Sequence, residues 1–136
     1  MPSTLDTKGF ELVQFPTKVK DFREDDEVIS VYYKEVEEML KQVTGATRVI
    51  VFDHNLRESK LTLTNDHTFG KKNTASSSLV RVHGDYSEFS GPERLRMLTK
   101  VRSATGVLVD PEEAAPLLKR RFSLINVWRN IEDTNV

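Results

Sequence analysis

The chain has 136 residues, enough for one domain with a buried core, and 38% of them are hydrophobic. Its 20 Lys and Arg residues nearly balance 21 Asp and Glu residues, so it lacks the basic excess typical of nucleic-acid-binding domains. The absence of cysteine excludes disulfides and thiolate metal sites but leaves the compartment undecided, and no apolar stretch is long enough to span a membrane. A soluble, cytoplasmic protein is the default expectation.

An edge strand and a long amphipathic helix are the first predicted elements. Residues 9–13 are expected to form the strand. The acidic residues 24–27 are typical of a first helical turn, where negative charge favours the helix dipole. Apolar side chains then recur every three or four residues, at Val28, Tyr32, Val36, Met39, Leu40 and Val43. Gly45 is suited to end this helix, whose apolar stripe we interpret as a core-packing face rather than a ligand contact.

A strand is predicted next, over residues 48–54. Its four consecutive apolar residues are mostly β-branched, which is typical of a strand covered on both faces. His54 and Arg57 lie at its end, a common place for functional side chains, and are candidate active-site residues. A turn-capping Asp53 and a surface His54 explain the pattern equally well. The polar residues 58–78 that follow are expected to form a long loop.

The apolar run at residues 79–86 carries the most informative motif. His83 and Asp85 are two positions apart, so in a strand they project from the same face. An imidazole and a carboxylate on one face supply two of the three protein ligands of a non-haem Fe(II) site. The pattern also arises by chance, and a strand-end histidine hydrogen-bonded to a neighbouring aspartate is the simpler interpretation of the pair alone.

Two short helices are predicted after this strand. Ser90 and Glu93 have the spacing of a capping box, and Pro92 favours a helix start. The basic residues of this helix are interpreted as a solvated face. The second helix is expected to begin at an Asp110 cap, and Pro116 is expected to keep it short or kinked.

The last predicted strand covers residues 121–129. In a strand, Asn126 and Trp128 face the same side and Arg129 faces the other. A buried Asn126 would need hydrogen-bond partners. Arg129 is a candidate anion contact because its planar fork suits a carboxylate, although an ordinary ion pair at the sheet edge is the slightly favoured interpretation.

With these segments in order, the sequence resembles the hydroxylase/desaturase family of Fe(II)- and 2-oxoglutarate-dependent oxygenases, which includes gibberellin desaturase-like proteins and a component of cephalosporin 7-alpha-methoxylation. The matching stretches are residues 9–13, 32–36, 44–49, 52–57, 82–87, 90–94, 121–122 and 125–129. The resemblance implies an α+β fold that contains a partial double-stranded β-helix, or jelly roll, with flanking helices. It also implies Fe(II) held by His83, Asp85 and a distal histidine, with 2-oxoglutarate as cosubstrate.

The remaining site residues follow from the same resemblance and from their chemistry. Asn126 and Arg129 are expected to contact the cosubstrate. His54, Arg57, Tyr86 and Trp128 are expected to lie at the active site. Members of the family continue beyond the Asn-Val-Trp-Arg strand, and their distal histidine lies in that later part.

Residues 1–136 are therefore expected to form one incomplete oxygenase-like domain that lacks its C-terminal strands and the distal ligand. His54 or His67 would substitute for that ligand only if the fold brings one of them to the metal. Unpaired strand edges would favour association into an oligomer. The leading functional hypothesis is an oxygenase that hydroxylates or desaturates a small secondary-metabolite-like molecule. The alternatives are a non-catalytic remnant that binds a partner or a small acid, and a generic α+β structural domain.

Overall fold

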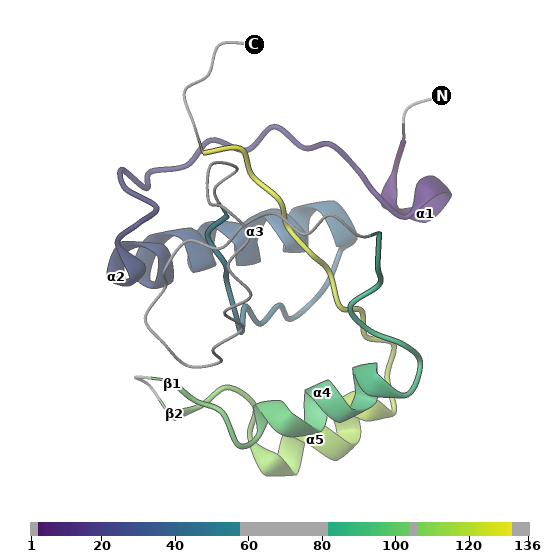
Figure 1. Cartoon of the computed structure of the whole chain (residues 1–136). Coiled ribbons are helices and arrows are strands. Elements are labelled where there is room, and N and C mark those ends of the chain that lie inside the picture. The colour runs from purple at the N-terminus through teal and green to yellow at the C-terminus, as the bar shows by residue number, and fades with distance from the viewer. Residues whose placement is uncertain (1–2, 58–81, 104–105, 132–136) are drawn as a thin grey trace. The chain divides into compact units, whose positions relative to one another are not determined.

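The computed structural model describes residues 3–57, 82–103 and 106–131, and the chain divides into two compact units, Met1–Val49 and Ile50–Val136. The first unit contains helices α1 (Leu5–Lys8), α2 (Asp25–Glu27), η1 (Val28–Tyr32) and α3 (Tyr33–Thr44) (Figure 1). The second contains α4 (Ser90–Leu98), β1 (Arg102–Ser103), β2 (Gly106–Val107) and α5 (Pro111–Leu118). Among the described helices, none is long and apolar enough to cross a membrane.

The long helix predicted in the first unit is confirmed. The elements α2, η1 and α3 follow one another without a break, and the middle turn, η1, is a π-helix. Val28 and Val36 from the predicted apolar stripe are buried. Tyr32 from the same stripe packs edge-on against Phe22, with 5.1 Å between the ring centroids. The stripe is therefore a packing face, as the spacing indicates.

Two glutamates of this helix bind the segment that precedes it. The Glu35 carboxylate accepts hydrogen bonds from Thr17 Oγ1 and from the backbone N–H of Lys18, at 2.6 and 2.8 Å. Glu27 accepts two more backbone N–H groups further along the segment, at 3.0 and 3.1 Å. Because this segment forms no regular secondary structure, the carboxylates satisfy donors that would otherwise rely on water.

Gly45 ends α3 in the left-handed conformation, with φ +69°, and its N–H donates to the Lys41 carbonyl. Gly45→Ala is expected to lower the free energy of unfolding by about 1 kcal/mol, because a β-carbon is disfavoured at this φ. Gly91→Ala is the matched control. Gly91 is helical, and an added β-carbon would meet Leu124 Cδ1 at an ordinary 3.5 Å. Urea denaturation would compare the two variants, and a similar loss in both would contradict the assigned role of Gly45.

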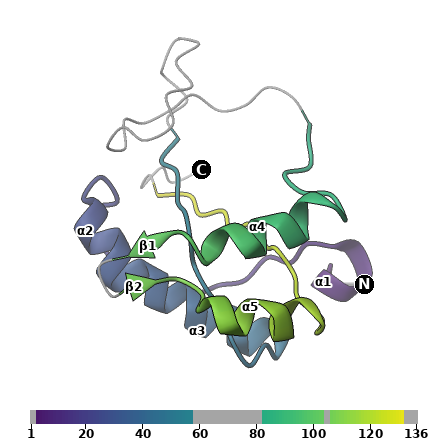
Figure 2. The ribbon, with the colours of Figure 1, turned by 90° about the horizontal axis from the view of Figure 1, so that it is seen from below.

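The core of the second unit lies between α4 and α5, which run side by side and are joined through the β1–β2 hairpin (Figure 2). The two strands are antiparallel, with Arg102 opposite Val107 and Ser103 opposite Gly106. The buried core residues are Leu95, Leu98, Val109 and Ala114. Ile50, Phe52, Leu108, Leu117 and Leu118 are partly buried and pack against them.

The cap predicted for α4 is wrong, whereas the cap predicted for α5 is confirmed. For α4 the predicted capping box of Ser90 with Glu93 is wrong. Ser87 and Ser90 form a reciprocal pair, in which each side-chain oxygen accepts the backbone N–H of the other residue, at 3.2 and 2.8 Å. Glu93 instead pairs with Arg96, at 2.6 Å. For α5 the predicted cap is confirmed, because the Asp110 carboxylate accepts the N–H two residues further on, at 2.9 Å.

The structure assigns no strand to residues 9–13, 48–54, 82–86 or 121–129, where strands were predicted. A strand requires a paired neighbour, and a local apolar pattern predicts an extended chain without supplying that neighbour. The predicted loop at residues 58–78, His67 within it, and residues 79–81 lie outside the described residues. The double-stranded β-helix and the single incomplete domain stay predictions.

Candidate metal centre

The predicted metal ligands lie in the irregular segment before α4, with Asp85 at a bend of the chain. His83 Nε2 is 3.3 Å from Asp85 Oδ1, so the two side chains come together as their spacing predicts. They do so from chain that belongs to no strand. Their side chains are 47% and 41% exposed, respectively. The pair is therefore preformed and remains accessible to a ligand from solvent.

Asn126 reaches the same carboxylate from the far end of the second unit. Its Nδ2 group donates a hydrogen bond to Asp85 Oδ2, across 41 positions of sequence. Each oxygen of the carboxylate thus has its own neighbour: Oδ1 faces His83 and Oδ2 accepts from Asn126. Three of the predicted site residues are brought together in this way.

The contacts around α4 explain why these segments meet. The Ser87–Ser90 pair fixes the turn that follows Asp85. Leu124 lies against Gly91 in the first turn of α4, and Asn126 follows two positions later. Leu124 thus contacts the start of α4 while Asn126, two positions later, contacts Asp85 in the segment just before it.

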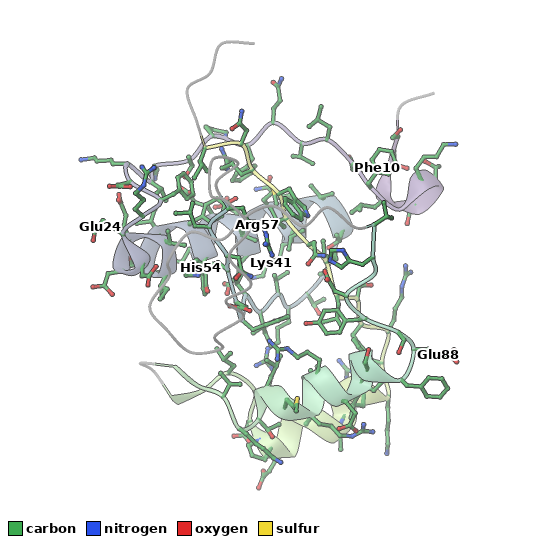
Figure 3. All side chains as sticks on the ribbon, viewed as in Figure 1. Phe10, Glu24, Lys41, His54, Arg57 and Glu88 are labelled. Atoms are coloured by element: carbon green, nitrogen blue, oxygen red, sulfur yellow. The ribbon has the colours of Figure 1, made fainter. Side chains whose placement is uncertain are left out.

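The other predicted site residues occupy varied environments. His54 and Arg57 come from the described segment 50–57 and are partly buried (Figure 3). Tyr86 follows Asp85 directly and is 39% exposed, whereas Trp128 is 79% exposed. Arg129 is partly buried. Within the described residues, no group of three or more His, Asp or Glu side chains is placed to hold a metal ion, so His54 does not complete a three-ligand group with His83 and Asp85.

The His83–Asp85 pair fits two of the three protein ligands of an Fe(II) site. Two donor atoms bound side by side to one metal ion, at bond lengths of about 2.1 Å, lie roughly 3 Å apart. The 3.3 Å between His83 Nε2 and Asp85 Oδ1 is close to this separation. Imidazole nitrogen and carboxylate oxygen are also the donors that non-haem Fe(II) takes. The described residues therefore offer two suitable donor groups but not a third.

Arg94 departs from the prediction that the basic residues of its helix form a solvated face. Its guanidinium carbon lies 4.7 Å from the centre of the Phe52 ring, a cation–π contact. Its Nε atom is buried and makes no hydrogen bond. The prediction is wrong for this residue because helix periodicity takes no account of the aromatic ring of a distant segment.

Comparisons with known proteins agree with a redox function. Residues 2–136 match the family model described as an oxidoreductase/YMDC permease-like domain. The uncharacterized protein in the dcmA 3′ region of Methylophilus leisingeri is 34% identical over 95% of this chain and 66% of its own length. The hydroxylase/desaturase CTB9 of Cercospora beticola is 36% identical over 93% of this chain and 38% of its own length. The alpha-ketoglutarate-dependent dioxygenase phiK of a fungal species is 40% identical over 42% of this chain and 21% of its own length.

These findings place the chain in the class of oxidoreductase-like proteins. The chain belongs to the oxidoreductase/YMDC permease-like family, and its resemblance to the hydroxylase/desaturase group of 2-oxoglutarate-dependent oxygenases is confirmed. The chain spans about two-fifths of the length of the fungal hydroxylase/desaturase relatives that it matches almost throughout. No solved structure matches it.

Proposed function

We propose that the chain forms part of an Fe(II)- and 2-oxoglutarate-dependent oxygenase that hydroxylates or desaturates a small, secondary-metabolite-like molecule. The observation that carries the proposal is the preformed His83–Asp85 pair, with its donor atoms 3.3 Å apart and both side chains open to solvent. The hydroxylase/desaturase and alpha-ketoglutarate-dependent dioxygenase names of the relatives support the same chemistry.

In this proposal each residue has a defined task. His83 presents Nε2 and Asp85 presents one carboxylate oxygen to the metal ion. Bound there, Fe(II) with 2-oxoglutarate would let O2 act as the oxidant that removes hydrogen from a substrate carbon, with the 2-oxoglutarate oxidised to succinate and CO2. Arg129 is proposed to pair with a carboxylate of the cosubstrate through its planar guanidinium. The partial exposure of the two ligands leaves room for a cosubstrate beside them.

A third protein ligand is proposed to come from outside the described residues. The relatives are longer, and a three-ligand site is the usual way to hold non-haem Fe(II). The partial double-stranded β-helix is part of the same proposal, since it would place that ligand opposite His83 and Asp85. With two ligands alone, Fe(II) would be held weakly.

The test is the anaerobic addition of Fe(II) and 2-oxoglutarate to the full chain. A keto acid chelated to Fe(II) gives a visible charge-transfer band, which we expect for the wild type and not for His83→Ala. Glutarate is the matched control ligand, because it keeps both carboxylates but has no keto group to chelate the metal. Absence of the band from folded wild-type protein, or an undiminished band in His83→Ala, would overturn the proposal. Binding of 2-oxoglutarate without the band would instead favour the non-catalytic module.

A further inference from the structure

We propose that Asn126 is a positioning residue, which fixes the Asp85 carboxylate so that only Oδ1 is presented to a divalent metal ion. The inference rests on the proposed function. The inference goes beyond the proposed function because it assigns the metal-binding oxygen of Asp85. It also gives Asn126 a role other than contact with the cosubstrate.

The contacts of the carboxylate carry the argument. An ionised carboxylate only accepts hydrogen bonds, so the Asn126 group that faces Asp85 is the amide NH2 and not the amide oxygen. This donor engages Oδ2 and opposes rotation of the carboxylate. The other oxygen, Oδ1, is the one that faces His83 Nε2. A metal ion that uses both residues is therefore bound through Oδ1 and Nε2.

The backbone around Asn126 makes it suitable for this task. Leu124 Cδ1 lies against Gly91 in α4, two positions before Asn126. The Ser87–Ser90 pair fixes the turn two positions after Asp85. Both ends of the hydrogen bond are thus tied to the start of α4. Groups that orient a metal ligand through a hydrogen bond typically contribute about 10- to 100-fold to metal affinity.

The test uses Co(II) as the probe metal, because its visible absorption reports the coordination geometry. Titration of the full chain would compare the wild type with Asn126→Ala and Asn126→Leu, of which the second keeps a side chain branched at Cγ but has no donor. We expect about 10- to 100-fold weaker binding in both variants and an altered Co(II) spectrum at saturation. Ser123→Ala, an exposed change in the same segment, is the control and should bind Co(II) as the wild type does.

The outcomes separate this inference from the proposed function. If the wild type takes up no Co(II), both fail. If the wild type binds Co(II) and His83→Ala does not, while the Asn126 variants keep the wild-type affinity and spectrum, only the inference about Asn126 fails. Urea denaturation of the metal-free proteins tests whether the Asn126 substitutions weaken metal binding only by destabilising the fold. We expect the same midpoint for the wild type and both Asn126 variants, and weaker metal binding that tracks a lowered midpoint would also overturn the inference.

Discussion

Asp85→Ala is expected to weaken Fe(II) binding by more than about 100-fold. The substitution removes one of the two metal ligands that we propose, and even the loss of a group that only orients a ligand typically costs about 10- to 100-fold. His83 would then be the one proposed metal ligand left among the described residues. Anaerobic titration calorimetry with Fe(II) would measure the affinities of the wild type and the variant.

Glu88→Ala is the matched control for this change. Glu88 is an exposed carboxylate three positions after Asp85 in the same segment, and its side chain is seen in Figure 3 at the start of α4. We expect this variant to keep the wild-type affinity, because no metal-binding group includes Glu88 among the described residues. Equal losses in the two variants would mean that Fe(II) is held by surface charge in general, and the site would have to be abandoned.

Leu98→Ala is expected to lower the free energy of unfolding of the second unit by about 2–5 kcal/mol. Leu98 is 3% exposed and belongs to the core cluster with Leu95, Val109 and Ala114. Val109 in the same cluster is fully buried, so the space left by the lost side-chain carbons has little freedom to collapse. The loss combines the removed apolar contact with the cavity that remains. Urea denaturation followed by circular dichroism would measure it.

Met97→Ala tests whether the effect belongs to the buried face of α4. Met97 neighbours Leu98 on the same helix, but its side chain is 55% exposed. A surface change of this kind usually alters stability by no more than about 0.5 kcal/mol. A loss at Met97 as large as that at Leu98 would contradict the orientation of α4 in the core.

The helices were predictable from sequence because their signals are local. The acidic residues 24–27, the apolar stripe after them and the glycine at Gly45 predict a helix that the structure confirms at Asp25–Thr44. The Asp110 cap is equally local. The start of α4 at Ser90 was also predicted correctly, but its cap was not: two serine-based spacings overlap there, and Ser87 pairs with Ser90 in place of Ser90 with Glu93.

Of the candidate site, the sequence predicts only the contact between residues that are close together along the chain. The two-residue separation of His83 and Asp85 keeps their side chains within reach of each other, although the chain bends at Asp85. The partner of Asn126 lies 41 positions away, and no periodicity identifies it. The contact of Arg94 with Phe52 is missed for the same reason. The predicted strands depend on pairing between distant segments, which a single sequence does not encode as a local pattern.

The π-helical turn η1 has a consequence for the helix on either side of it. An α-helix advances by about 100° per residue, so residues eight apart, such as Val28 and Val36, would point about 80° away from each other. A π-turn is wider and rotates less per residue, which reduces this divergence. The wide turn thereby brings the directions of the two valine side chains closer together, and both are buried. A strictly α-helical path through the same residues would place the two valines nearer to opposite edges of the apolar face.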